Sequence, residues 1–381
     1  MASLVHAPHA GGDLAVVDRP HVLRSTPHAC PDPIDLPDCV TMTSPAHGVR
    51  PLADFIRGII NDAASEPATL LPGGVSSDIR LVEYAGAQYC VKQALPQLKV
   101  LADWRAPVER NHSEAEWLRV VGELAPEAVP NVVCEDQAAG WFVMEYLPPD
   151  QFPVWKSLLR DGAIDSSFAA MTGAQLARIH AATANRADLA QRFANEHIFY
   201  PIRPEPYLIA TGRAHPDLAV RLQDLSDVTM NTRLALVHGD VSPKNILAGP
   251  RGPVFLDAEC AWYGDPAFDL AFVLNHMLLK CVWRPQWTGR YLQCFDALRD
   301  AYLDGVNWEP REKMELRTAH LLPGLLLGRI DGKSPAEYIT GDTDRNFVRA
   351  VARGLLIDPV PSLTAIRDAW SAACAARPAD C

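Results

Sequence analysis

His238-Gly239-Asp240-Val241-Ser242-Pro243-Lys244-Asn245 joins two apolar runs, residues 234–237 before it and Ile246-Leu247 after it. A second polar group, Asp257-Ala258-Glu259, ends the apolar run of residues 253–256. Short apolar runs bounded by turn residues are typical of buried strands. The pattern therefore predicts an acid, an amide and two further carboxylates at the ends of short buried strands.

These side chains have the chemistry that phosphoryl transfer requires. Its transition state is loose, so catalysis consists mainly of positioning and neutralisation of charge. We expect Asp240 to orient a substrate hydroxyl and to accept its proton as the catalytic base. Oxygen ligands suit Mg²⁺, so Asn245 and Asp257 are predicted metal ligands, with Glu259 as a further ligand or an anchor behind them. ATP and Mg²⁺ are the cofactors that this reaction implies.

The spacing between Asp240 and Asn245 is that of the protein-kinase catalytic loop. We expect His238 to brace this loop through its ring nitrogens. Lys244 is a tentative substrate-site residue that could reach the transferring phosphoryl group, and a solvent-facing lysine is the alternative. An H-x-D-x-x-x-x-N loop followed by a D-x-E group is specific enough to disfavour a chance collection of polar residues.

Bulk properties are those of a soluble globular chain long enough for two lobes. The formal net charge of −11 argues against a nucleic-acid partner, which would need clustered Lys and Arg. No run of about 18 apolar residues predicts a transmembrane helix, and the first residues lack the features of a signal peptide. Nine cysteines without C-x-x-C pairs indicate reduced thiols and a cytoplasmic location.

The first half of the chain begins irregularly and then becomes periodic. Residues 1–48 are rich in Pro, His, Asp and Gly, which predicts a poorly ordered or irregular N-terminal arm. Apolar residues at helical spacing in 52–60 predict an amphipathic helix. Residues 70–93 then read as strand, Gly-containing loop, strand, turn and strand.

The loop and third strand of this region are the predicted nucleotide-binding elements. Gly73, Gly74 and Ser76 could present backbone N–H groups to phosphates, and a plain turn is the alternative. Lys92 lies in the third strand, where a kinase-type lysine contacts the phosphates. An edge-strand lysine that points into water is the other interpretation of Lys92.

A helix that starts near Pro107 and ends near Leu124 follows. Glu114 or Glu116 on this helix could pair with Lys92 and fix its ammonium, and Glu114 is the preferred partner. Both acids could instead be solvated on an exposed face.

Residues 141–147 predict a buried strand that ends at a proline pair. In a two-lobed kinase this strand is the hinge, where backbone groups around Glu145 and Leu147 would meet the adenine edge. An ordinary strand is the alternative.

Helical periodicity dominates after residue 150. Residues 168–181 form a clear helix on which His180 is expected to be a hydrogen-bonded core histidine. Further helices are expected at 269–280, 290–306, 312–327, 343–356 and 362–376. The proline-rich segment 199–207 reads as a shaped loop.

The fold class predicted is α+β, with a bilobal protein-kinase-like architecture. The expected division is an arm at 1–48, a nucleotide-binding N-lobe at 49–147 and a catalytic C-lobe at 148–381.

The motif H-G-D-V-S-P-K-N-I-L, followed by F-L-D-A-E-C-A-W-Y-G-D-P-A-F-D-L-A, resembles the aminoglycoside phosphotransferase and choline kinase superfamily. This resemblance implies transfer of phosphate from ATP to a hydroxyl of a small molecule, with Asp240 as base and Asn245 and Asp257 as metal ligands. Asp265 would cap the helix that follows it, and Asp269 would tether the catalytic loop. Only seven residues separate Asp257 from Asp265, so there is no activation loop for a protein substrate.

The first half is similar to methylthioribose kinases in K-Q-A-L-P at 92–96 and in a Trp-containing loop. This similarity supports Lys92 as the phosphate-contacting lysine, and it allows a homodimer. The second half differs, since the loop carries Asn245 and only one arginine, Arg329, stands where that family has two. Arg329 is a tentative substrate contact, with a helix-cap or surface role as the alternative.

Three functional hypotheses follow. The leading one is a kinase of a methylthioribose-like sugar. The second is an aminoglycoside- or choline-type kinase of a cationic substrate. The third is a nucleotide-binding pseudokinase scaffold, which the presence of Lys92, Asp240, Asn245 and Asp257 disfavours.

Overall fold

The computed structural model describes residues 49–61, 68–71, 77–95 and 107–377. The predictions for the arm at 1–48 and for Gly73, Gly74 and Ser76 lie outside these residues. From Ala46 onward the chain forms one compact unit. We use N-lobe for residues 49–147 and C-lobe for the described residues from 148 onward, and the boundary between them stays a prediction.

The N-lobe contains a five-stranded antiparallel sheet in the order β1-β2-β3-β5-β4. Its strands are β1 (Ala68–Leu70), β2 (Ser77–Tyr84), β3 (Ala87–Ala94), β4 (Val132–Asp136) and β5 (Trp141–Glu145). The three predicted strands before residue 95 are confirmed. The tight turn between β2 and β3 uses Ala85 and Gly86 at positive φ, which suits a two-residue hairpin.

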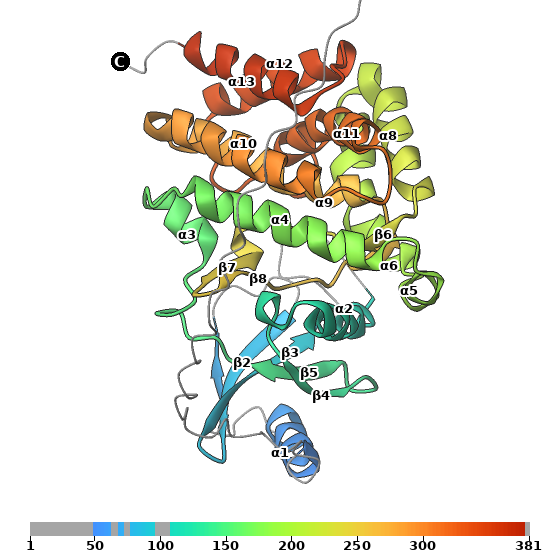
Figure 1. Cartoon of the computed structure of the whole chain (residues 1–381), viewed down its shortest axis with the longest axis vertical. Coiled ribbons are helices and arrows are strands. Elements are labelled where there is room, and N and C mark those ends of the chain that lie inside the picture. Colours follow the sequence, from blue (N-terminus) through green and yellow to red (C-terminus); the bar gives the residue numbers. More distant parts are fainter. Residues whose placement is uncertain (1–48, 62–67, 72–76, 96–106, 378–381) are drawn as a thin grey trace, which may run out of the picture. The chain divides into compact units, whose positions relative to one another are not determined.

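Two helices cover opposite faces of this sheet (Figure 1). Alternation along β3 and β5 sends Val91 and Val143 toward α1 (Val49–Asn61), where Leu52, Ile56 and Ile59 are buried. The opposite face meets α2 (Arg110–Leu124). Lys92 follows Val91 in β3 and therefore points to the α2 side, which is the side that faces the C-lobe.

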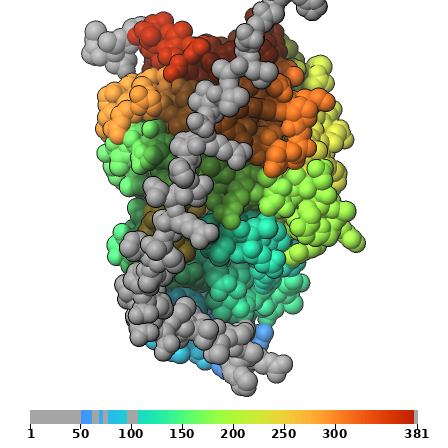
Figure 2. Space-filling model, in the orientation of Figure 1, coloured from blue at the N-terminus to red at the C-terminus, as the bar shows by residue number. Residues whose placement is uncertain are grey.

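Helices build most of the C-lobe. They are α3 (Trp155–Arg160), α4 (Ser166–Thr183), α5 (Ala187–Arg192), α6 (Glu196–Ile202), α7 (Ala210–Ala214), α8 (Ala219–Asn231), α9 (Pro266–Trp283), α10 (Thr288–Asp304), α11 (Arg311–Asp331), α12 (Asp342–Ile357) and α13 (Leu363–Ala375). All six C-lobe helices expected from periodicity are confirmed. α4 packs along α10 and α9 packs along α11, so one apolar core continues through the lobe (Figure 1). Figure 2 shows the two lobes in contact where teal meets green.

The motif residues lie at the ends of short strands, as expected, and these strands form two antiparallel pairs. β6 (Ala235–Val237) pairs with β9 (Trp262–Gly264), and β7 (Ile246–Gly249) pairs with β8 (Gly252–Phe255). Their side chains are mostly buried, in agreement with the apolar runs. Together with the N-lobe sheet, this confirms the α+β class and the bilobal, kinase-like architecture.

The prediction of a loop at 199–207 is wrong. This segment contains the end of α6 and the start of a π-helical turn, η2 (Glu205–Ile209). Pro206 sits in the first turn of η2, where a backbone N–H has no helical partner, and Pro201 lies near the end of α6. Burial of Phe199 and Tyr207 against the core stabilises the helical conformation in spite of the prolines.

In the described part of the chain, no helix combines the length and the apolar character needed to span a bilayer. The six cysteines in this part are free thiols, and five of them are buried, as expected for small core residues.

Candidate active site

The two strand pairs bring the catalytic-loop motif and the D-x-E group together. His238 follows β6 directly, and Asp257 lies two residues after β8. Leu256 N donates to Asn245 O at 2.9 Å, and His238 Nε2 lies 3.1 Å from Leu256 O. The backbone of Asp257 is held in the left-handed region, at φ +66°. Such a conformation in a non-glycine residue often marks a functional position.

Asp240 is buried, and donors converge on one of its carboxylate oxygens. Its Oδ2 accepts from Asn245 Nδ2 at 2.9 Å and lies 3.0 Å from Arg203 Nη2 and 3.3 Å from Lys244 Nζ. Among the described residues no donor reaches Oδ1. One oxygen is thus fixed by the protein while the other can accept a hydrogen bond from a substrate.

Arg203 is a site residue that the sequence did not reveal. Its guanidinium also donates to Gly239 O at 2.5 Å and to Ile202 O at 2.8 Å, so it ties α6 to the catalytic loop. Burial alone would lower the pKa of Arg203, but the Asp240 carboxylate, together with Cys260, Tyr207 and Glu259, raises it above its ordinary value. The sequence signal for Arg203 is a charged residue inside an aromatic and proline-rich segment. That segment predicts a loop, so the sequence does not place Arg203 at the site.

Lys92 links the N-lobe to the C-lobe. Its Nζ lies 2.5 Å from Glu114 Oε2 and also contacts Asp257 Oδ1. Glu114 uses its other oxygen to accept from Asp257 N at 3.2 Å. The predicted pairing of Lys92 with Glu114 is therefore present, whereas Glu116 pairs with Arg119 and Arg192.

The charges in this cluster are mutually dependent. Burial works against the ammonium of Lys92, but the carboxylates of Asp257 and Glu114 more than compensate and raise its pKa. Burial also works against ionisation of Asp257, yet the ammonium of Lys92 holds the pKa of Asp257 below its ordinary value. Burial raises the pKa of Glu114 more than Lys92 lowers it. The pKa of Asp257 is thus lower than that of Glu114.

Glu259 lies behind this cluster and is bound to a second buried cation. Its Oε2 accepts from Arg110 Nε at 3.1 Å, and Arg110 also donates to Leu95 O at 2.6 Å and to Pro107 O at 2.9 Å. Of the two roles expected for Glu259, this contact favours the anchor over the metal ligand.

The catalytic loop is braced from behind by Asp269, as expected. Asp269 accepts from His238 N at 2.7 Å and from Gly239 N at 2.8 Å, and His180 Nε2 lies 3.2 Å from it. His180 is fully buried, which confirms its expected role in the core. Gly239 has φ +79° and approaches Cys260 so closely that an added Cβ would lie 2.8 Å from Cys260 Cβ.

His238 braces the loop through both ring nitrogens, as predicted. Asp240 N donates to His238 Nδ1 at 3.1 Å, so this nitrogen carries no proton and Nε2–H donates to Leu256 O. Burial lowers the pKa of His238, which favours the neutral ring. The one ring proton of His238 is thus held on Nε2 by Leu256 O, which suits a bracing role.

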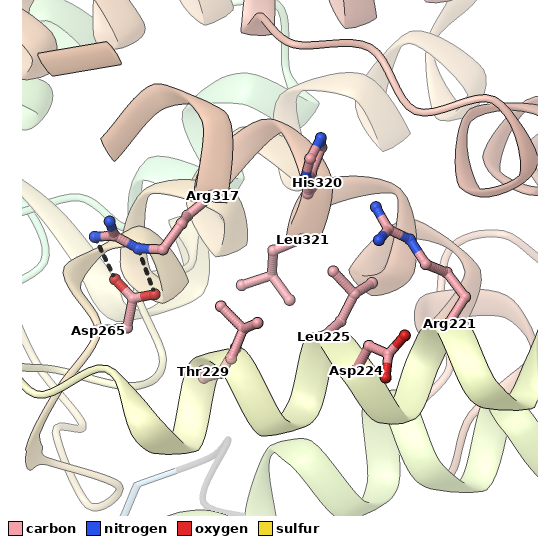
Figure 3. A pocket seen from close by; sticks show the side chains of 9 residues that line it. Arg221, Asp224, Leu225, Thr229, Asp265, Arg317, His320 and Leu321 are labelled. Atoms are coloured by element: carbon pink, nitrogen blue, oxygen red, sulfur yellow. Dashed lines mark hydrogen bonds and ion pairs between the residues drawn. The ribbon is translucent and has the colours of Figure 1, made fainter. Parts of the chain in front are cut away.

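Asp265 caps α9 through a hydrogen bond from Ala267 N, which confirms the helix-cap prediction. Arg317 binds both oxygens of Asp265 at 3.0 Å beside a small hollow between α8 and α11 (Figure 3). This hollow has a volume of about 70 Å³, and none of the residues that contact Lys92 or Asp240 line it. We therefore assign the Asp265–Arg317 pair to support of α9, the helix that carries Asp269.

The predicted adenine-contacting and substrate-site residues differ in their exposure and in their contacts. Glu145 is exposed, and its N–H donates to Asn131 O at 2.9 Å, whereas no hydrogen bond to the backbone of Leu147 is found among the described residues. Lys244 is half-exposed beside Asp240, whose carboxylate raises the pKa of Lys244. Arg329 is buried near the end of α11 and donates to Ser334 O at 2.7 Å and to Tyr207 OH at 3.3 Å.

Asn245 and Asp257 offer the oxygen donors that a hard cation prefers. Asn245 Nδ2 donates to Asp240 O and Oδ2, so the amide is oriented with its Oδ1 away from these contacts. Among the described residues no donor reaches that Oδ1. An oriented amide oxygen beside a low-pKa carboxylate fits a Mg²⁺ site.

Comparison with known proteins agrees with this geometry. A family model described as the phosphotransferase enzyme family matches residues 67–312. The methylthioribose kinase of Erwinia tasmaniensis is 26% identical over 239 residues, which are 55% of this chain and 58% of that protein. Methylthioribose kinase 1 of Oryza sativa subsp. japonica is 24% identical over 221 residues, 50% of each chain. The chain thus spans little more than half the length of these relatives.

Among solved structures, the amicoumacin kinase hAmiN in complex with AMP-PNP, Ca²⁺ and Ami is similar to this chain. The TM-score is 0.50 at 14% identity, with 84% of this chain and 98% of that chain covered. At this identity the similarity concerns the fold. It agrees with the bilobal arrangement of the described residues.

Proposed function

Because this chain belongs to the phosphotransferase enzyme family, we propose that it is an ATP- and Mg²⁺-dependent kinase that phosphorylates a hydroxyl group of a small molecule. One observation carries the proposal. The ammonium of Lys92 contacts both Glu114 and Asp257, and so connects the N-lobe lysine to the loops that hold Asp240 and Asn245. This combination of charges is the one that phosphoryl transfer uses.

The nucleotide would lie between the β3 lysine and the strand end at Leu147. Leu147 has backbone groups free of partners among the described residues and is the better candidate for the adenine edge than Glu145, whose N–H is already used. Lys92 would contact the phosphates while Glu114 retains its ammonium. In this role Lys92 exchanges its contact with Asp257 for a contact with phosphate, which frees a carboxylate oxygen of Asp257.

Asn245 Oδ1 and the Asp257 carboxylate would hold Mg²⁺, with Glu259 kept in place behind them by Arg110. When bound, the cation neutralises charge on the nucleotide phosphates. The low pKa of Asp257 keeps its carboxylate ionised for this purpose over the physiological pH range.

Asp240 would act as the base through Oδ1. Arg203, Asn245 and Lys244 occupy the side of Oδ2, so Oδ1 is available to the acceptor hydroxyl. As the hydroxyl oxygen bonds to the γ-phosphorus and the bond from phosphorus to the bridging oxygen breaks, the hydroxyl proton passes to Asp240. Lys244, half-exposed beside Asp240, is placed to neutralise the transferring group.

For the acceptor, similarity to methylthioribose kinases supports a sugar-like molecule. A cationic acceptor of the aminoglycoside or choline type would require carboxylates in addition to those of the metal site, and the charged side chains that contact Asp240 among the described residues are the cations Arg203 and Lys244. A pseudokinase is disfavoured because the lysine, base and metal-ligand positions are all filled. We further propose a cytoplasmic enzyme without nucleic-acid or membrane partners, in which a homodimer remains a hypothesis from the same relatives.

The test is ATP-dependent phosphorylation of a panel with methylthioribose, other pentoses, choline and an aminoglycoside, measured as ADP release with Mg²⁺ or with EDTA. We expect Asp240→Asn to lower kcat by about 10²–10⁴-fold, the range for loss of a general base. Its thermal stabilisation by ATP and Mg²⁺ should persist. Equal turnover by Asp240→Asn and the parent, or turnover in EDTA, would contradict the proposal.

A further inference from the structure

One face of α9 leads from the catalytic loop to a buried lysine. Phe272, His276 and Lys280 are spaced one helical turn apart, about 12 Å along the axis from first to last. The guanidinium of Arg203, which binds Asp240, lies 5.7 Å from the Phe272 ring centre. The rings of Phe272 and His276 are in edge contact at 5.6 Å. A row of contacting side chains thus connects the catalytic base with Lys280.

Lys280 is a buried cation without an anionic partner. Its residue is 1% exposed, and its ammonium lies 5.0 Å from the Tyr338 ring centre and 5.3 Å from that of Trp283. Within the described residues no carboxylate or hydrogen-bond acceptor reaches this ammonium. Tyr338 connects Lys280 to the neighbouring turn of α9, because its OH lies 3.3 Å from His276 Nδ1 while its ring lies under the Lys280 ammonium.

The neighbours of Lys280 add further positive charge. Lys156 of α3 lies over the same Tyr338 ring, and Arg329 lies over the Tyr207 ring that Arg203 also covers. Among the described residues, the one carboxylate near these three cations is that of Glu337, whose side chain is 60% exposed and ion-paired with Lys156. In the part of the chain that the structure describes, the Nε of Arg329 is buried without a partner.

Burial of Lys280 among other cations disfavours its charged form. Burial itself, then the charge of Lys156 and that of Arg329, lower the pKa of Lys280 to about 7, while Glu337 opposes this shift. Two aromatic rings attract an ammonium but do not replace its hydration shell. Burial and the cations Arg329, Lys280, Lys244 and Lys156 likewise lower the pKa of His276. A further cation would meet repulsion here, whereas an anion would be attracted.

We propose that Lys280, with Lys156 and Arg329, forms a subsite for an anionic group of the phosphate acceptor, so that the acceptor is a hydroxylated molecule carrying a carboxylate or phosphate. This inference rests on the proposed kinase function. The hydroxyl that reacts would lie at Asp240. The anionic group would lie beyond the side chains of Phe272, His276 and Tyr207, at Lys280. The acceptor is then sugar-like but acidic.

The test compares acceptors that differ mainly in charge. Ribose 5-phosphate carries an anion where methylthioribose carries its thioether, and ribonate provides the carboxylate; ribose and choline complete the series. We expect kcat/KM for an anionic acceptor to exceed that for the neutral sugars by about 100-fold, as one charge-assisted contact allows. The anionic acceptor with the higher kcat/KM shows whether the subsite prefers a phosphate or a carboxylate.

Lys280→Met removes the charge and keeps the bulk of the side chain. We expect it to reduce the preference for the anionic acceptor to below about 10-fold, through KM rather than kcat. Lys313→Met, at an exposed position of α11, is the matched control and should keep the full preference. A second readout is thermal stabilisation by ribose 5-phosphate or ribonate alone, expected in the parent and lost in Lys280→Met.

Equal or better turnover of methylthioribose, ribose or choline than of the anions would overturn the inference and leave the kinase function intact. So would an unchanged preference in Lys280→Met. If no acceptor is phosphorylated, the proposed function fails instead. The subsite is then decided by the thermal shift alone: stabilisation by an anion in the parent but not in Lys280→Met supports it, and any other pattern refutes it.

Discussion

The guanidinium of Arg203 lies 3.0 Å from the carboxylate of Asp240, and the same side chain holds the carbonyl of Gly239. The arginine that follows α6 therefore fixes both the backbone and the side chain of the catalytic loop. Because Arg203 contacts Oδ2, it leaves Oδ1 of Asp240 without a donor among the described residues. This contact connects the helical core of the C-lobe to the proposed base.

Replacement of this arginine should affect turnover more than nucleotide binding. Arg203→Lys keeps the charge but loses the planar fork that reaches Asp240, Gly239 and Ile202 together. We expect kcat to fall at least about 10-fold and unfolding stability to fall by about 1–3 kcal/mol, with KM for ATP unchanged. Steady-state kinetics and urea denaturation measure both. The control is Arg213→Lys, at an exposed pair with Glu205, and an equal effect of the two would refute the role of Arg203.

Glu114 should matter for ATP, and its neighbour Glu116 should not. Glu114→Gln leaves Lys92 with one carboxylate fewer, and a charge-assisted hydrogen bond contributes about 1.5–3 kcal/mol. We therefore expect KM for ATP to rise about 10-fold or more. Glu116→Gln disturbs only partly exposed pairs with Arg119 and Arg192, so its KM should stay within about 2-fold of the parent. Similar values for both variants would count against Lys92 as the phosphate lysine.

Two glycines with the same φ separate backbone strain from crowding. Gly86 and Gly239 both have φ +79°, but a Cβ at Gly86 meets nothing within 4 Å, whereas one at Gly239 meets Cys260. We expect Gly86→Ala to cost about 1–2 kcal/mol of unfolding free energy. Gly239→Ala should cost about 1–3 kcal/mol more, because the catalytic loop must move. Denaturation midpoints of the two variants would measure this difference. Equal losses of unfolding free energy would mean that the catalytic loop accommodates the added Cβ without cost.

Lys280 should make stability depend on pH above neutrality. Its pKa is about 7 in the folded protein and 10.5 as an ordinary lysine, so the folded state releases this proton first. Between these values the unfolded state holds more protons, and stability therefore rises with pH, by up to about 1.4 kcal/mol per unit. The charged or titratable groups that surround it are Lys156, Arg329, Glu337, His276 and Tyr338.

The measurement is urea denaturation of the parent and of Lys280→Met from pH 7 to 9.5. The variant lacks the titrating group, so its advantage over the parent should be largest near pH 7 and should shrink as the pH rises. The exposed substitution Lys313→Met should follow the parent at every pH. A constant difference between the parent and Lys280→Met would show that Lys280 does not titrate in this range.

The residues of the catalytic loop were predictable because their information is local. Spacing alone placed Asp240, Asn245 and Asp257 at the ends of short apolar runs, and the antiparallel pairing of these strands then brings those ends together. Lys92 was predictable for the same reason, since strand alternation fixes the face on which it points. The helix periods also identified the long C-lobe helices.

The sequence by itself thus determined the fold class, the loop and the lysine strand, all of which follow from short-range periodicity and spacing. Only the tertiary structure decided that Glu114 rather than Glu116 meets Lys92, that Glu259 is bound to Arg110, and that Arg203 reaches Asp240. These contacts join segments far apart in the chain, and burial of aromatic side chains made a helix of the proline-rich segment that carries Arg203. The same long-range packing left Lys280 buried without a counter-charge among the described residues, which no local pattern records.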